Sequence, residues 1–217
     1  MGNSEGLALL QSLGARSIPV VSKGDKFVFA QSVSDVVKFL GLDVDTRPQL
    51  SPAELVAKYD MILEAAARYT RQIPDDKLGG NIFDRDRTYH ELTYHVFRIA
   101  EALLDTANGA ELTVSYYSDK PPAEMQTVEQ IANFGDEVRE RLVTWWAGYP
   151  HKSGDAIVNT YFGQKPLHEI LERSTWHSGQ HVRQIVMAME KLMGVKPENP
   201  LTSSDFAGLP MPEKIWD

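Results

Sequence analysis

Four long stretches after residue 50 carry apolar residues at helical spacing, and each opens with a helix-start signal. Ser51, Thr88 and Thr127 each precede a Glu or Gln by three residues, which is the arrangement of a capping box. Pro166 opens the fourth stretch, where the missing N–H of proline removes no helical hydrogen bond. The predicted helices cover residues 51–72, 88–107, 127–146 and 166–193. Together they predict a four-helix bundle over residues 51–195.

A segment of different character, residues 1–45, precedes these helices. It combines two short helical patterns with two β-rich runs, at residues 7–13, 18–21, 27–29 and 32–40. The last segment, residues 196–217, is Pro-rich and irregular but keeps apolar residues, so we expect it to dock on the bundle. The expected fold class is therefore mainly α, with a small α/β segment before the bundle.

The composition excludes several classes of function. With a net charge of -8 and a pI near 5.3, the chain of 217 residues shows no basic surface for nucleic acid. It has no cysteine, which excludes disulfides, thiolate nucleophiles and thiolate metal ligands. The N-terminus lacks a signal-peptide pattern, and no apolar run is long enough for a bilayer. We expect a cytoplasmic protein with a small-molecule substrate and no membrane partner.

Three of the six histidines are predicted to face one another inside the bundle. His177 and His181 are four residues apart in Trp-His-Ser-Gly-Gln-His, so both lie on one face of the last helix. His95 lies on the apolar face of the helix at 88–107. A single such histidine is usually a core residue bonded to a carbonyl or carboxylate, but three facing ones would need three separate sets of partners. The trio therefore predicts a divalent metal site with an open coordination position.

The other polar candidates are given no role at this site. The remaining histidines are expected at the surface: His90, His151 and His168. No carboxylate stands out as a general base, because Glu91 is expected to cap a helix and Asp84 and Asp86 to be solvated or capping. Three neutral nitrogen ligands suit Zn²⁺, Ni²⁺ or Fe²⁺ equally, so the metal is left open and the catalytic residues are unknown.

Residues 51–195 resemble the DinB / YfiT-like superfamily of metal-binding four-helix bundles. The resemblance is carried by Thr88–Val96, Tyr161–Leu167 and the Trp-His-x-x-x-His pattern of Trp176–His181. In that family one histidine ligand comes from the second helix and two from the last long helix. The matching positions imply His95, His177 and His181 as the metal ligands. Many members have a further histidine where this chain has Arg173, which is a departure from the family pattern.

The same resemblance implies a chemistry. Characterised members of the superfamily include transferases and isomerases that act with bacillithiol, mycothiol or glutathione. It implies a metal-dependent S-transferase or isomerase in which the metal activates a low-molecular-weight thiol such as glutathione. Two alternatives stay open: a hydrolase in which the metal activates water, and a metal-binding scaffold domain without turnover.

Residues 5–42 resemble the C-terminal half of a glutaredoxin: a helix, the turn Ser17-Ile18-Pro19, a hairpin and a closing helix. The resemblance implies that Ile18 and Pro19 present extended backbone to the peptide part of glutathione, as an added strand would. The first half of a glutaredoxin and its redox cysteines are missing, so a redox function is excluded. The alternative is a structural remnant. Because a two-stranded hairpin is marginal alone, its edges need the bundle or a second subunit, and we expect a homodimer.

Overall fold

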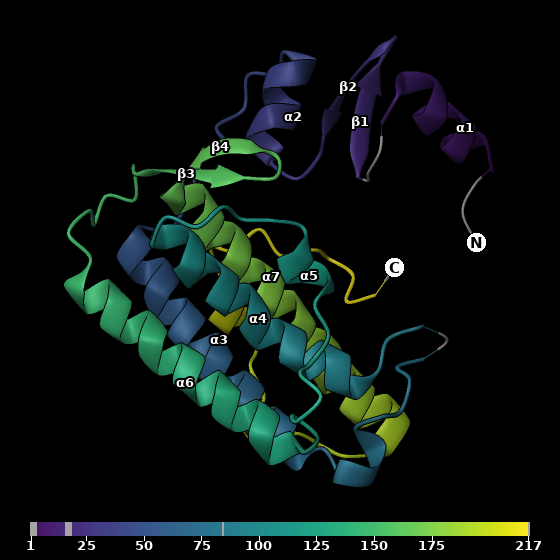
Figure 1. Cartoon of the computed structure of the whole chain (residues 1–217), viewed down its shortest axis with the longest axis vertical. Coiled ribbons are helices and arrows are strands. Elements are labelled where there is room, and N and C mark those ends of the chain that lie inside the picture. Colours follow the sequence, from purple (N-terminus) through teal and green to yellow (C-terminus); the bar gives the residue numbers. More distant parts are fainter. Residues whose placement is uncertain (1–3, 16–18, 84, 217) are drawn as a thin grey trace. The chain divides into compact units, whose positions relative to one another are not determined.

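The computed structural model describes residues 4–15, 19–83 and 85–216. This part of the chain is mainly helical, with two small antiparallel sheets of two strands each (Figure 1). The mainly helical class expected from the sequence is confirmed. The chain divides into two compact units between Arg47 and Pro48.

The first unit consists of two short helices and a hairpin: α1 (Ser4–Leu13), β1 (Val20–Lys23), β2 (Lys26–Phe29) and α2 (Val33–Leu40). Val20 pairs with Phe29 and Lys23 with Lys26, so the two-residue turn is Gly24–Asp25. Gly24 has a φ of +64°. Ser32 caps α2 by accepting from the Asp35 N–H at 3.4 Å. The order helix, hairpin, helix is the one that the sequence predicts.

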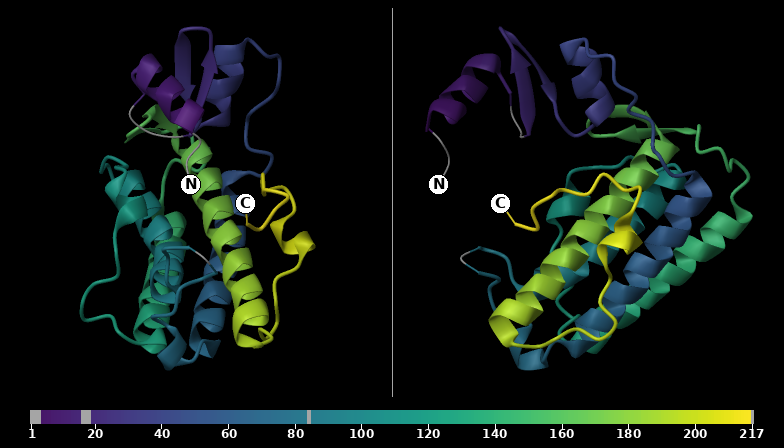
Figure 2. Two further views of the ribbon diagram at one scale, coloured as in Figure 1. Left: turned by 90° about the vertical axis from the view of Figure 1, so that its right-hand side faces the viewer. Right: turned by 180° about the vertical axis from the view of Figure 1, so that it is seen from behind.

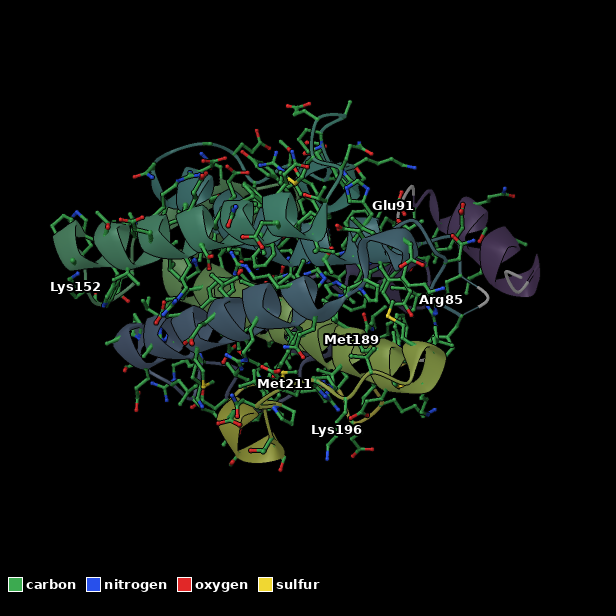
Figure 3. All side chains as sticks on the ribbon, turned by 90° about the horizontal axis from the view of Figure 1, so that it is seen from below. Arg85, Glu91, Lys152, Met189, Lys196 and Met211 are labelled. Carbon is green, nitrogen blue, oxygen red and sulfur yellow. The ribbon has the colours of Figure 1, made fainter. Side chains whose placement is uncertain are left out.

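The second unit contains four long helices: α3 (Pro52–Gln72), α4 (Tyr89–Ala107), α6 (Val128–Gly148) and α7 (Leu167–Ala188). The helices α3 and α4 each pack against both α6 and α7 (Figures 1 and 2). Side chains fill the space between them (Figure 3), and fully buried examples are Tyr59, Ile62, Val96, Leu103, Val138 and Ile185. A π-helical turn (Met189–Met193) extends α7, and Gly194 ends it with a φ of 67°.

Helix starts in this unit follow from side-chain chemistry. Complete capping boxes open α3, α4 and α6, at Ser51, Thr88 and Thr127, as predicted. In each box the side-chain oxygen accepts an N–H of the first turn, which has no partner within the helix. The start of α7 differs: Pro166 is the last residue of a strand, and no side chain caps the helix.

The connections contain elements that the sequence analysis did not predict. They are the 3-10 turn Asp75–Lys77, the short helix α5 (Ser115–Ser118) and the hairpin of β3 (Ile157–Thr160) and β4 (Gly163–Pro166). Ile157 pairs with Pro166 and Thr160 with Gly163. The hairpin leads directly into α7 and therefore sets where that helix begins.

The C-terminal segment lies along α7, with a 3-10 turn at Ser203–Phe206 (Figure 2). Phe206 and Leu209 are buried, and the Lys58 ammonium on α3 donates to the Asp205 carbonyl at 2.8 Å. Leu192 lies within the π-helical turn Met189–Met193 and is 45% exposed. Among the described residues no helix has the length and apolar character needed to cross a membrane.

Candidate metal centre

The predicted histidine trio comes together inside the second unit. Ring centroids of His95 and His181 lie 4.9 Å apart, those of His177 and His181 4.8 Å, and those of His95 and His177 5.6 Å. One ring nitrogen of each residue lies within 4.8 Å of the others. One face of α7 thus supplies two imidazoles and α4 supplies the third.

The residues between the two histidines of α7 hold that helix against its neighbours. The Ser178 hydroxyl donates to the Val96 carbonyl at 3.0 Å, one residue after His95, and lies 2.9 Å from the Tyr59 hydroxyl. Gly179 leaves room for Phe206, because a Cβ there would lie 3.2 Å from a ring carbon of that residue. The Ser178 hydrogen bond therefore links α7 to α4 at the level of the three rings.

The donor atoms fit a metal ion. His177 Nδ1 and His181 Nε2 are buried and have no hydrogen-bond partner in the described part of the chain. A buried polar atom without a partner lowers the stability of the fold, and a bound metal ion would supply that partner. A metal–nitrogen bond is about 2.0–2.1 Å, so two nitrogens on one ion lie at most about 4.2 Å apart. The three nitrogens lie within 4.8 Å of one another, which is close to that limit. No Asp or Glu joins the cluster among the described residues.

The surroundings keep all three rings neutral. Burial lowers the pKa of His95 to about 2, and the neighbouring His181 adds to the shift. Burial also lowers the pKa of His177 well below its ordinary value, and the other two rings lower it further. Burial and then the charge of Arg87 lower the pKa of His181 to about 4. Neutral imidazoles have a free lone pair, which is the form that binds metal.

Aromatic and positively charged side chains lie beside the three histidine rings. The Tyr117 ring stacks on His177 with 5.6 Å between centroids and 19° between planes. Arg173, one turn before His177 on α7, donates to the Tyr117 hydroxyl at 2.6 Å and to the Tyr161 hydroxyl at 3.4 Å. Arg87, partly buried just before α4, contributes a second positive charge that lowers the pKa values of all three histidines. The side chains beside the cluster thus favour an anionic group.

The other histidines stand apart from the cluster. The ring nitrogen Nε2 of His90 lies 2.6 Å from the Met125 carbonyl, and that of His168 lies 2.8 Å from the Leu50 carbonyl. Both side chains are partly exposed, and each bonds a backbone carbonyl of a loop. His151 is exposed in a loop, as predicted.

The remaining sequence candidates have ordinary structural roles where they are described. Glu91 closes the capping box of α4 and pairs with Lys120 at 3.0 Å. Asp86 is exposed, and Asp84 lies outside the described residues. The carbonyl of Pro19 accepts from the Ala30 N–H at 2.9 Å, so this oxygen is already used within the first unit. Ile18 lies outside the described residues.

A cavity of about 550 Å³ lies between α7 and the C-terminal segment. Val182, Val186, Phe206 and Ile215 are among its lining residues, and none of the three histidines is. The cavity and the histidine cluster are therefore separate features of the second unit. At the cluster, and not among the residues that line the cavity, two buried histidine nitrogens without a hydrogen-bond partner in the described part of the chain lie close together.

No protein-family model matches this sequence, and no curated protein matches it.

Proposed function

We propose that this chain is a metal-dependent enzyme of the DinB / YfiT-like type, an S-transferase or isomerase that uses a low-molecular-weight thiol such as glutathione. In this proposal α3, α4, α6 and α7 are the four-helix bundle of that superfamily. The observation that carries it is the convergence of three neutral histidines, two of them with a buried nitrogen that lacks a partner. The short motifs named above supply the link to the superfamily.

A divalent ion held by these residues, Zn²⁺, Ni²⁺ or Fe²⁺, would lower the pKa of an incoming thiol towards neutrality. The protein's own side chains have three further tasks. His95, His177 and His181 hold the ion with uncharged donors, which leaves it strongly electrophilic. The Arg173 guanidinium, 5.0 Å from the Tyr117 ring centroid, offers positive charge to a carboxylate of a thiol such as glutathione. The stacked Tyr117 ring restricts the approach of water beside His177.

The first unit enters the proposal only through the thiol contacts that the glutaredoxin resemblance implies. The predicted contacts at Ile18 and Pro19 stay a prediction, as does the homodimer. Pro19 has no N–H to donate to a peptide-like ligand, and its carbonyl already accepts from the Ala30 N–H. The thiol contacts of this proposal therefore depend on the second unit.

Metal binding is the first test. We expect the purified protein to hold close to one ion per chain by elemental analysis. The variant His177→Ala should lose the ion and keep its helical circular dichroism, because the helices are held by their apolar core. His151→Ala, an exposed loop histidine, is the matched control and should keep the ion. Stoichiometric metal in His177→Ala would show that the assignment is wrong.

Turnover separates this proposal from its alternatives. We expect the loaded protein to convert an electrophile only when glutathione or another small thiol is present. Cleavage of an ester or amide without thiol would instead support a hydrolase. A scaffold domain would show neither, and it is disfavoured because the cluster contains no carboxylate among the described residues to close the coordination shell.

A further inference from the structure

We infer that Gln184 and the C-terminal segment 212–216 position His181 as a metal ligand, with the segment acting through Gln184. This inference rests on the proposed metal site. Gln184 is a positioning residue, since it contacts a ligand and not the ion. Nothing in the sequence motifs connects the C-terminal segment to the histidines.

The hydrogen bonds around Gln184 have only one possible direction. Its side-chain Nε2 donates to the Ile215 carbonyl at 3.0 Å, and its Oε1 lies 2.7 Å from Nδ1 of His181. A backbone carbonyl can only accept, so the amide nitrogen must face Ile215 and the amide oxygen must face His181. His181 therefore carries its proton on Nδ1.

This assignment explains the other nitrogen of the ring. With the proton on Nδ1, Nε2 of neutral His181 has a lone pair and no proton. Nε2 is also the buried atom of His181 that has no partner in the described part of the chain. The glutamine thus turns the free lone pair of His181 towards His95 and His177, and it prevents the tautomer that could not bind through Nε2.

The segment that holds Gln184 is itself fixed by other contacts. Gln180, one turn earlier on α7, donates to the Lys214 and Ile215 carbonyls at 3.1 and 2.8 Å. Arg183 donates to the Pro212 carbonyl at 2.8 Å. The Trp216 ring packs against Phe83, with 5.7 Å between ring centroids. Because of these contacts, the Ile215 carbonyl is in place independently of His181.

The first experiment reads the tautomer in the metal-free protein. In a long-range ¹H–¹⁵N correlation spectrum we expect wild-type His181 to be the Nδ1–H form. Gln184→Leu should shift it towards a mixture of tautomers, whereas Gln184→Glu, which keeps an acceptor, should retain the Nδ1–H form. Gln180→Leu removes a hydrogen bond to the Ile215 carbonyl. It should shift His181 towards the same mixture of tautomers as Gln184→Leu, but to a smaller extent.

The second experiment measures Zn²⁺ affinity by competition with a chelator. Loss of a partner behind a metal-bound histidine usually weakens binding by about 10–100-fold, and we expect this for Gln184→Leu. The matched control is Gln72→Leu. Gln72 also holds the C-terminal part of the chain, by accepting from the Glu198 N–H at 2.8 Å, but it has no contact with a histidine. It should leave both the tautomer and the affinity unchanged.

The outcomes distinguish this inference from the proposed function. If wild-type protein binds no Zn²⁺, Ni²⁺ or Fe²⁺, the proposed function is wrong, and the tautomer in metal-free protein still decides the role of Gln184. If the metal binds but Gln184→Leu keeps both the Nδ1–H form and the wild-type affinity, the positioning role is wrong. An effect of Gln184→Leu with none of Gln180→Leu would overturn the part assigned to the segment.

Discussion

Gly135 on α6 faces α4 where there is no space for a side chain. A Cβ at this position would lie 2.4 Å from a ring carbon of Phe97, which is fully buried. We expect Gly135→Ala to lower the free energy of unfolding by about 1–3 kcal/mol, because the Phe97 ring must move within a packed core. This loss opposes the gain of up to about 1 kcal/mol that alanine brings to a helix. Urea denaturation measures the difference.

Gly148, the last residue of the same helix, is the control for this prediction. An added Cβ there meets no atom within 4 Å. Gly148→Ala should therefore leave the free energy of unfolding unchanged or raise it slightly. Equal destabilisation by both substitutions would mean that close packing on Phe97 is not the cause.

The buried histidines make the stability of the metal-free protein depend on pH. The pKa of His181 is about 4 in the folded state, below its ordinary value of 6.5, because of burial. Between these values the unfolded chain binds more protons than the folded one, so the free energy of unfolding falls as pH falls below 6.5. In His181→Gln this fall should be shallower by up to about 1.4 kcal/mol per pH unit. Urea denaturation at several pH values tests it, and identical slopes would contradict it.

Sequence patterns predict a helix or strand correctly where the side chains that form it lie close together in the chain. The starts of α3, α4 and α6 are confirmed because a Ser or Thr cap and its Glu or Gln partner lie within one turn. The hairpin of β3 and β4 was missed, since Asn159, Gly163 and Gln164 are poor strand formers. Pro166 was assigned only to a helix start, although it also pairs with Ile157 in the hairpin.

The residues of the candidate site likewise include some that the sequence predicts and some that it does not. Helical spacing brought His177 and His181 together, and the apolar face of α4 added His95. Tyr117 was missed because α5 is a four-residue helix with no periodic pattern. Gln184 lies three residues after His181, so helical spacing alone could have suggested it as a partner. Its contact with Ile215 could not be foreseen, because it depends on the path of an irregular segment.

The capping box of α4 supplies a prediction for that helix. The Thr88 hydroxyl accepts from the Glu91 N–H at 3.1 Å, and the Glu91 carboxylate accepts from the Thr88 N–H at 3.1 Å. Thr88→Ala should therefore lower the free energy of unfolding by about 1 kcal/mol, seen as a lower melting temperature in calorimetry. Thr144, exposed within α6, is the matched control: Thr144→Ala removes the same atoms without a cap and should not destabilise. A similar loss in both variants would rule out the cap as the source.

At the scale of the whole molecule, hydrophobic burial is confined to one unit. Every buried apolar side chain of the described residues belongs to the second unit, from Leu55 to Leu209. In the first unit Ser32 is the sole buried residue among those whose side chains are described. A unit of this size buries too little surface to be stable by itself. The second unit therefore determines the thermal stability of the chain.

The isolated second unit provides the corresponding prediction. A protein of residues 48–217 should unfold cooperatively at nearly the temperature of the full chain, and residues 1–47 alone should show no transition in circular dichroism. Sedimentation of the full chain and of residues 48–217 tests the expected homodimer separately. If the first unit supplies the dimer contact, the full chain should sediment as a dimer and residues 48–217 as a monomer. Loss of cooperative unfolding in residues 48–217 would instead show that the first unit completes the core, despite its lack of buried apolar side chains among the described residues.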